Sequence, residues 1–252
     1  MATLLRPQAA HVATTTQTHR PRGAYAANAA QIRRISIEFP APMEGARRTL
    51  NVAVAVIGII VTAPLMLVIA ALVRLTSSGP VLYTQTRIGL DRRRRQHVGH
   101  HAGRQANAGG RPFTIYKFRT MAAGGPAKQV WADPKDSRIT ALGRFLRRSR
   151  LDELPQLFNV LQGDMNVVGP RPEQPAIFAS LRESLIAYPR RQRVRPGITG
   201  WAQVNHHYDQ SIKDVQKKLA YDLEYIRRQS LLEDLRIMWR TPMVMLGWRG
   251  GW

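Results

Sequence analysis

The sequence predicts a mixed α/β fold that is mostly helical, with one N-terminal membrane helix ahead of a single folded domain. Three observations lead to this fold class. Residues 52–73 carry no charge over 22 positions, long enough for the hydrocarbon core of a bilayer. Two short segments, 81–87 and 113–121, have the composition of strands. Most of the remaining apolar residues repeat at helical spacing.

The charge of the chain is strongly positive. Its 38 Lys and Arg residues exceed its 16 Asp and Glu residues by 22. A field of this sign attracts anionic partners, and nucleic acid, an anionic lipid surface and a phosphorylated substrate all fit it. None of the 252 residues is cysteine, which excludes disulfides, thiol catalysis and cysteine-ligated metals.

Composition divides the chain into four parts. Residues 1–46 are rich in Ala, Thr, Gln, Pro and Arg without a sustained period, so we expect a disordered basic tail. No apolar stretch closely follows the first residues, which argues against a secretory signal. The apolar segment and its flanks, 47–75, come next. We expect one domain over 76–246, with a solvated loop of Arg, His and Gly at 91–111, and a short tail at 247–252.

The apolar segment has a proline near its middle. Pro64 removes a backbone hydrogen bond and bends a helix, and the Thr62 hydroxyl is placed to bond freed carbonyls. A re-entrant helix, broken near Pro64 and leaving by the face it entered, would keep both basic flanks on the cytoplasmic side. An ordinary tilted span with a proline kink is the alternative, and a buried core helix is disfavoured by the length. The flanking arginines are Arg47, Arg48, Arg74 and Arg87.

The two strands are expected to form a small sheet. Val81–Arg87 follows a Ser-Gly-Pro turn. In Phe113–Met121, period two places Lys117 and Arg119 side by side on one face, where they suit a phosphate. A solvated strand face is the alternative explanation for such a pair.

Helical spacing marks three later segments. Ile139–Arg148 is basic and amphipathic, and helices are expected from Ser211 and from about Leu231. The last of them carries Asp234 and Trp239. With Trp248, Trp252 and the arginines at 236, 240 and 249, Trp239 resembles an anchor at a membrane interface. Core packing is the alternative for its Trp239.

An adjacent acidic pair, Asp152 and Glu153, is the first candidate for chemistry. Pro155 suits the first turn of a helix, so we expect the pair at a helix N-terminus, where the dipole favours ionised carboxylates. Helix capping is the commoner role of such residues, but arginines lie just upstream. Two loops stiffened by proline and glycine follow: Gly169–Pro172, which contains Arg171, and Arg195–Trp201.

Taken in order, these motifs resemble the bacterial sugar transferases called monotopic phosphoglycosyl transferases, or polyprenyl-phosphate hexose-1-phosphate transferases. The resemblance runs from about Arg47 to about Leu246. A lone acidic pair carries little weight, whereas five ordered motifs behind a proline-broken apolar segment are specific. The matching segments are Lys117–Met121, Ser149–Val160, Gly163–Met165, Val168–Pro172 and Val194–Asn205.

The resemblance implies a reaction, its partners and its location. A UDP-sugar and polyprenyl (undecaprenyl) phosphate would give polyprenyl-diphospho-sugar and UMP, with Mg²⁺ as cofactor, as the first membrane step of exopolysaccharide or other glycoconjugate assembly. The site would lie on the cytoplasmic face of the bacterial inner membrane. The family's re-entrant helix-break-helix matches Pro64. Membrane lipids are then partners and nucleic acid is not, and a homodimer stays open.

The resemblance also assigns roles. Asp152 would be the nucleophile that forms a covalent phosphosugar intermediate, and Glu153 would support it in metal or proton handling. Both carboxylates are candidates for contacting Mg²⁺. A late supporting acidic residue falls on Asp234. The family's phosphate-handling groups fall on Lys117, Arg147 and Arg171, and the strand pattern adds Arg119.

Some features depart from the family, and rival functions exist. The loop at 92–110 is longer than expected, and His206-His207-Tyr208 replaces the usual residues after Asn205, so no sugar identity is transferred. One apolar segment indicates a minimal catalytic form. A nucleic-acid-binding protein would explain the charge but not residues 52–73. The other rivals are a non-catalytic membrane scaffold and a transferase of the sugar alone, which would release UDP.

Overall fold

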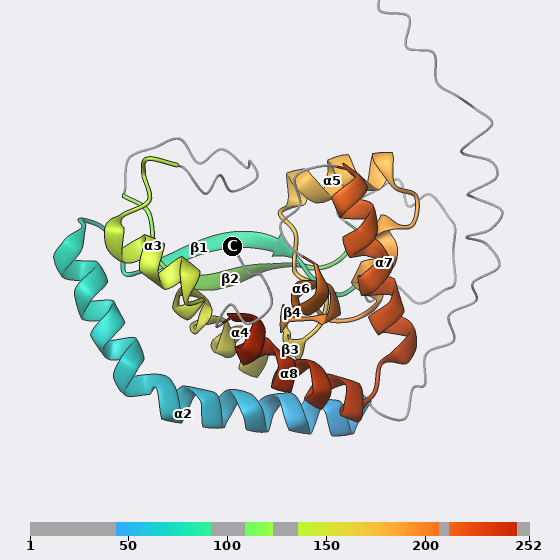
Figure 1. Ribbon diagram of the computed structural model, residues 1–252, viewed down its shortest axis with the longest axis horizontal. Coiled ribbons are helices and arrows are strands. Elements are labelled where there is room, and N and C mark those ends of the chain that lie inside the picture. Colours follow the sequence, from blue (N-terminus) through green and yellow to red (C-terminus); the bar gives the residue numbers. More distant parts are fainter. Residues whose placement is uncertain (1–43, 92–108, 123–135, 207–211, 246–252) are drawn as a thin grey trace, which may run out of the picture. The chain divides into compact units, whose positions relative to one another are not determined.

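A computed structural model of the chain describes residues 44–91, 109–122, 136–206 and 212–245. Helices supply most of this part, and its strands form two small sheets (Figure 1). The mixed, mostly helical fold class is therefore confirmed. The expected tail at 1–46 lies outside the described residues except for its last three positions, as do most of the loop at 91–111 and the tail at 247–252.

The first described element is α2, a long apolar helix over Glu44–Thr76. It is long and apolar enough to cross a membrane, and only 11% of its most apolar 18-residue window is buried. A core helix of a soluble protein would bury most of that window. The exposed apolar side of α2, which includes Ile57, Ile60, Val61, Leu67 and Leu75, therefore needs another apolar environment.

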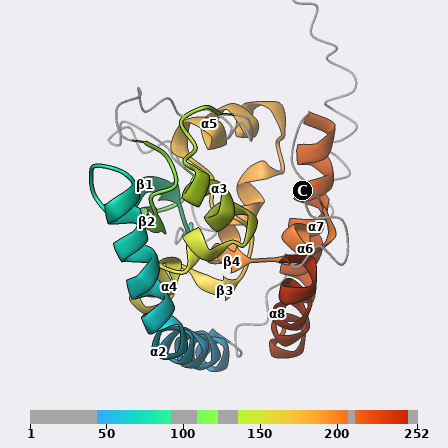
Figure 2. The same cartoon turned by 60° about the vertical axis from the view of Figure 1, so that its left-hand side comes forward.

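Helix α2 changes direction partway along its length (Figures 1 and 2). Pro64 lies inside the helix and has no N–H for the carbonyl of Ile60. Thr62 donates its hydroxyl to the Gly58 carbonyl at 2.6 Å, a back-bond that also bends helices. The expected break is thus a bend in a continuous helix, and Thr62 does not bond the carbonyl that Pro64 frees.

Strands β1 (Leu82–Ile88) and β2 (Pro112–Phe118) form an antiparallel pair that confirms the expected sheet. Strand β2 ends three residues earlier than expected. Leu82 pairs with Phe118, and only one further bond, from the Arg119 N–H to the Val81 carbonyl at 2.9 Å, follows. The chain before Val81 is the Ser-Gly-Pro turn, so β1 provides no partner beyond this point, and the chain after β2 instead pairs Met121 with Ile139 in an isolated bridge.

Helix α3 (Ala141–Arg148), the 3₁₀ turn η2 (Leu151–Glu153) and helix α4 (Gln156–Gln162) follow. The Thr140 hydroxyl caps α3 by accepting from the Gly143 N–H at 2.9 Å. A buried cluster packs α4 between α2 and β2, and it consists of Ala55, Phe113, Ile115, Leu157, Val160 and Met165. This cluster fixes η2, at the start of α4, against the sheet.

A second sheet, which the sequence did not predict, pairs β3 (Asn166–Val168) with β4 (Gly197–Thr199) in parallel. Between them lie α5 (Pro175–Ser184) and the 3₁₀ helix η3 (Tyr188–Arg193). A Cβ at Gly197 would stand 2.0 Å from the Gly169 nitrogen. The two glycine-containing loops therefore meet backbone to backbone, where no other residue fits.

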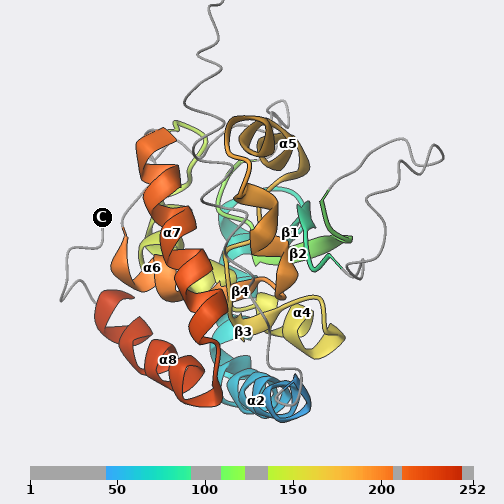
Figure 3. The same ribbon diagram turned by 90° about the vertical axis from the view of Figure 1, so that its right-hand side faces the viewer.

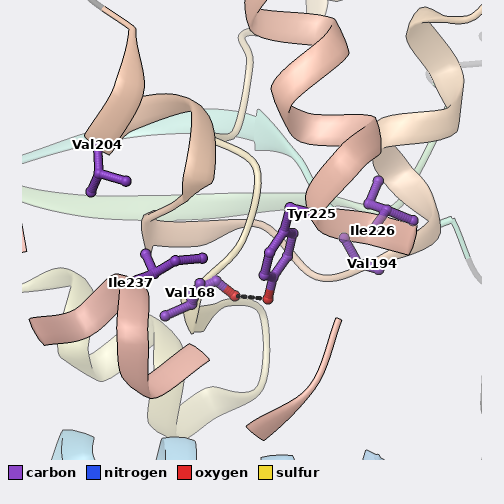
Figure 4. Close-up of a cluster of buried hydrophobic side chains, with 6 residues drawn as sticks. All are labelled: Val168, Val194, Val204, Tyr225, Ile226 and Ile237. Carbon is purple, nitrogen blue, oxygen red and sulfur yellow. Dashed lines mark hydrogen bonds between the residues drawn. The ribbon is translucent and has the colours of Figure 1, made fainter. Parts of the chain in front are cut away.

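Helices α6 (Trp201–Asn205), α7 (Ile212–Arg228) and α8 (Leu231–Met245) complete the described chain. Figure 3 looks onto α7 and α8. They share a buried cluster with β3, and Figure 4 shows the contact of 3.2 Å between the Tyr225 hydroxyl and the Val168 carbonyl at its centre. The cluster consists of Val168, Val194, Val204, Tyr225, Ile226 and Ile237. Trp239 is 75% exposed, so core packing does not explain it.

Candidate active site

The acidic pair lies on η2, one turn before α4 rather than at the helix N-terminus itself. Arg150 enters the turn in a left-handed conformation, with φ of 57°. This conformation is uncommon for a residue with a side chain and has an energetic cost. It reverses the chain between α3 and α4, so that Asp152 and Glu153 both point into the protein, where they are 6% exposed.

Glu153 contacts three cationic side chains, one from β2, one from the turn after β3 and one from the residue that precedes η2. Arg171 donates to both of its oxygens, at 2.6 Å to Oε1 and 3.2 Å to Oε2. Lys117 of β2 donates to Oε1 at 2.9 Å, and the Arg150 guanidinium lies 3.6 Å away. The structure thus brings together Lys117 and Arg171, two of the expected phosphate-binding residues, on the carboxylate beside Asp152.

The electrostatics of the two carboxylates differ. Burial by itself would raise the pKa of Glu153, but Arg171 and Lys117 hold that pKa well below its ordinary value. Burial raises the pKa of Asp152, and the neighbouring Glu153 charge adds to this, while Lys117 and Arg171 oppose it. Glu153 is therefore ionised and paired with the cations of the site. Asp152 makes no such ion pair among the described residues.

One oxygen of Asp152 also lacks a hydrogen-bond donor among the described residues. Its Oδ1 is buried and has no hydrogen-bond partner among the residues that the structure describes. A buried oxygen without a partner is costly and usually marks a functional group or a ligand site. Asp152 is thus the side chain of the site that is best placed to contact a bound ligand.

Asn159 sets the position of Lys117. Its side chain is fully buried, accepts from the Tyr116 N–H at 3.1 Å and donates to the Thr114 carbonyl at 2.7 Å. These bonds join α4 to β2 one residue before Lys117. Asn159 stood in a matching motif, yet nothing in the sequence separated it from the polar face of a helix.

Of the expected site residues, Arg119 and Arg147 do not contact the acidic pair, and neither does Asp234. Arg119 donates to the carbonyl and hydroxyl of Ser77, at 2.6 and 2.8 Å, at the end of α2. Arg119 does not lie beside Lys117 on one strand face, because β2 ends at Phe118 and the alternation of side chains ends with it. Arg147 donates to the Thr120 hydroxyl at 2.8 Å.

Asp234 joins α8 to α2 rather than to the site. Its carboxylate accepts from Arg47 at 2.8 Å and from the Tyr225 hydroxyl at 2.7 Å, and it is 2% exposed. Arg47 in turn donates to Tyr225 at 2.8 Å. This closed triad explains how an acidic residue is tolerated in the interior.

A second ionic cluster lies behind Arg171. Arg191 is buried and donates to Asp222 of α7 at 2.6 Å and to the Tyr188 hydroxyl at 2.7 Å. Glu173 accepts from Lys218 at 2.9 Å and lies 3.4 Å from Arg191. The sequence did not distinguish Arg191 from its neighbours in the run Tyr188–Arg193.

The pH dependence of stability tests this cluster. Burial alone would raise the pKa of Glu173, but Lys218 and Arg191 hold it at about 2, against an ordinary 4.5. A depressed pKa stabilises the fold above 4.5, and this contribution is lost as pH falls toward 2. We expect the free energy of unfolding to fall by about 3 kcal/mol over this window through Glu173.

The measurement is chemical unfolding in detergent, followed by tryptophan fluorescence at several pH values. Glu173→Gln should be less stable at neutral pH and should lack this part of the acid dependence. Asp136→Asn is the control, because Asp136 also has a pKa lowered to about 2 but lies partly exposed beside Arg138, outside this cluster. Equal slopes for the wild type and Glu173→Gln would contradict the assignment.

Known proteins align with most of the chain. A UDP-glucose:undecaprenyl-phosphate glucose-1-phosphate transferase of Xanthomonas campestris pv. campestris is 43% identical over 199 residues, covering 77% of this chain and 37% of that protein. A UDP-N-acetylgalactosamine-undecaprenyl-phosphate N-acetylgalactosaminephosphotransferase of Aeromonas hydrophila is 39% identical over 201 residues, covering 79% of this chain and 43% of that protein. The chain therefore spans about two fifths of the length of these two relatives.

A further relative is closer in length. A UDP-glucose:undecaprenyl-phosphate glucose-1-phosphate transferase of Caulobacter vibrioides is 38% identical over 203 residues, covering 79% of this chain and 69% of that protein. The family model described as Bacterial sugar transferase matches residues 43–248, which include η2, the Arg171 turn and all of α2. The chain belongs to the bacterial sugar transferase family.

Proposed function

We propose that this chain is a phosphoglycosyl transferase that moves a sugar-1-phosphate from a UDP-sugar to undecaprenyl phosphate. The observation that carries the proposal is the buried, unpartnered Asp152 carboxylate beside a Glu153 that holds Lys117 and Arg171. Cations beside a free carboxylate suit nucleophilic attack on a diphosphate. The names of the relatives supply the two substrate classes.

The chemistry runs in two half-reactions. An Asp152 oxygen attacks the sugar-linked phosphorus, the bond from that phosphorus to the bridging oxygen breaks, and UMP leaves with the oxygen. The acyl phosphate that remains on Asp152 carries the sugar. A phosphate oxygen of the polyprenyl carrier then attacks the same phosphorus, which forms polyprenyl-diphospho-sugar and returns Asp152 as a carboxylate.

The basic residues act on the phosphates. Arg171 presents a planar fork that matches two phosphate oxygens, and Lys117 presents a point charge. Both are held by Glu153 before the substrate arrives. Glu153 thus keeps the cations within reach of the diphosphate without a large rearrangement, and it keeps them from neutralising Asp152 fully.

The acidic pair also fits the Mg²⁺ of the family, with Asp152 as the better ligand. Its Oδ1 has no partner among the described residues, whereas the Glu153 oxygens are taken by Arg171 and Lys117. The described ranges hold no group of three or more His, Asp or Glu residues suited to a metal. Phosphate and water oxygens would therefore complete the coordination, as is usual for Mg²⁺. When bound, the ion supplies positive charge to the diphosphate.

Membrane association follows from α2 and α8. The exposed apolar face of α2 suits the hydrocarbon region, and its bend at Pro64 supports the re-entrant topology. On α8, Leu232 and Trp239 are more than 70% exposed. Exposed apolar groups beside arginines suit the interface with anionic lipid. A site above a shallow insertion meets a lipid phosphate and a soluble nucleotide together, on the cytoplasmic face of the inner membrane.

Cysteine labelling tests the topology. The chain has no cysteine, so Gly45→Cys and Ser78→Cys each report one flank of α2. A side chain at Gly45 would have no atom within 4 Å, and Ser78 is exposed. In intact cells we expect an impermeant maleimide to label neither position, and in inside-out vesicles to label both. The control Ile60→Cys, in the apolar segment, should react only after detergent is added. Labelling of one flank from outside the cell would establish a spanning helix.

Nucleotide release tests the reaction itself. Detergent-purified protein with Mg²⁺, undecaprenyl phosphate and a panel of UDP-sugars should release UMP over many turnovers with one or a few sugars, and without the carrier it should release no more than one UMP per protein molecule. Release of UDP would instead identify a transferase of the sugar alone. If neither UMP nor UDP were released, in detergent and again in native membranes, the proposed function would be contradicted.

A further inference from the structure

The turn that carries Arg171 is held at every backbone carbonyl from Pro170 to Glu173. The Pro170 carbonyl accepts from the Gly197 N–H at 3.0 Å and the Glu173 carbonyl from the Ile88 N–H at 2.9 Å. The Pro172 carbonyl accepts from the Arg87 side chain at 3.1 Å. Four successive carbonyls are thus bonded to three parts of the chain, β1, β4 and η3, and the bond from η3 is the one made to Arg171.

The Arg171 carbonyl accepts from a side chain that no substrate can reach. Arg191 donates to it from Nη2 at 3.0 Å, and the Arg191 side chain is 1% exposed. The remaining nitrogens of Arg191 bind Asp222 of α7 and Tyr188 of η3, at 2.6 and 2.7 Å. One guanidinium therefore fixes the backbone of Arg171 to two helical elements behind it.

Stability alone does not account for this arrangement, although removing one charge such as that of Glu173 weakens the fold. Arg191 and Lys218 balance Glu173 and Asp222, so two positive and two negative groups are buried together. Buried ion networks often stabilise a fold no better than apolar residues of the same volume. What this network provides is a fixed orientation, because a planar guanidinium with all three nitrogens hydrogen-bonded is held in one geometry.

We propose that Arg191 is a positioning residue for the transfer reaction: it aims Arg171 at the diphosphate by fixing the backbone from which that side chain extends. The inference rests on the proposed function, in which Arg171 contacts the phosphates. Arg191 touches no substrate. Arg191 affects kcat only through the Arg171 carbonyl. Its effect on kcat therefore disappears when the Arg171 guanidinium is removed.

A double-mutant cycle tests this dependence. Arg191→Lys keeps the charge toward Asp222 but cannot also reach the Arg171 carbonyl. We expect kcat for UMP release to fall on the order of 10- to 100-fold, as small misplacements of catalytic groups do, with a smaller change in KM for the UDP-sugar. In an Arg171→Lys background the same change should lower kcat by less than about twofold. Equal losses in the two backgrounds would show that Arg191 is only structural.

A matched control separates positioning from general damage. Arg48 also binds backbone carbonyls, those of Val160 and Leu161 at 2.6 and 2.7 Å, but at the far end of α4. Arg48→Lys should lower the unfolding temperature as Arg191→Lys does, and it should leave kcat unchanged. If Arg191→Lys does not fold, Tyr188→Phe removes one Arg191 partner and keeps the ring. It should give a smaller loss of kcat that again vanishes in the Arg171→Lys background, and a loss that persists there would overturn the proposal.

Hydrogen exchange provides a readout that does not depend on activity. Arg191→Lys should speed amide exchange at Gly169, Arg171 and Glu173 and over residues 151–154, and Arg48→Lys should speed it at the end of α4 instead. A wild type that releases no UMP would contradict the proposed function, while this exchange pattern would still test the positioning. Faster exchange spread evenly over α5 and α7, with 169–173 unchanged, would refute it.

Discussion

Asp152→Asn is expected to release UMP about 10⁴-fold more slowly than the wild type, or not at all, as when the nucleophile is removed from other covalent enzymes. The amide has nearly the shape of the carboxylate but does not attack phosphorus. A sugar-phosphate adduct should be trapped on wild-type protein incubated with UDP-sugar and no carrier, and it should be absent from the variant. Intact-protein mass spectrometry measures both.

The fold should survive this substitution. Asp152 carries a buried charge without a hydrogen bond on Oδ1, and burial raises its pKa. A neutral amide costs less to bury than an ion, so the unfolding temperature should be unchanged or higher. Asp164→Asn, just beyond the end of α4, is a control that should retain activity. Residual activity above about 1% in Asp152→Asn would contradict the nucleophile assignment.

Arg171→Lys is expected to lower kcat on the order of 10²- to 10³-fold, the size of effect seen when one donor to a developing charge is lost. The charge is kept, but the fork now bonded to both oxygens of Glu153 is replaced by a single ammonium. Since the charge that leaves with UMP develops during bond breaking, kcat should fall more than KM rises. Steady-state UMP release over a range of UDP-sugar concentrations separates the two constants.

Arg148→Lys provides the comparison. Arg148 is an exposed arginine on α3, so the same chemical change there should leave both constants within about twofold. If Arg171→Lys behaved like Arg148→Lys, Arg171 would be a structural ligand of Glu153 and the phosphates would be bound elsewhere.

The sequence predicted the elements that have a strong local signal. The apolar run, both strands of the first sheet and the last two helices are visible in composition and period, and the structure has them within a few residues. The second sheet was missed because β3 and β4 are three residues each and pair in parallel across a long connection. Such pairing leaves no periodic pattern in so short a segment.

The site shows the same limit. Lys117, Asp152, Glu153 and Arg171 stood in motifs, and the structure places them together. Arg119 was misplaced because one residue of strand length decides the face on which a side chain lies. Arg191 was missed because burial, which distinguishes it from Arg190, is a property of the assembled helices and not of the local sequence.

The first turns of α2 are also part of the domain interior. Arg47 binds Asp234, Arg48 binds the end of α4, and Asn51 accepts from the Val167 N–H of β3. The start of this helix is therefore part of the folded domain and not a separable membrane anchor. Removing it would strip Asp234, the α4 carbonyls and β3 of their partners, and exchanging it for a generic anchor would do the same. Engineering a water-soluble form of this protein therefore has to keep the α2 side chains that the domain buries, which are Arg47, Asn51, Ala55, Ile69 and Val73, and redesign only the exposed apolar ones.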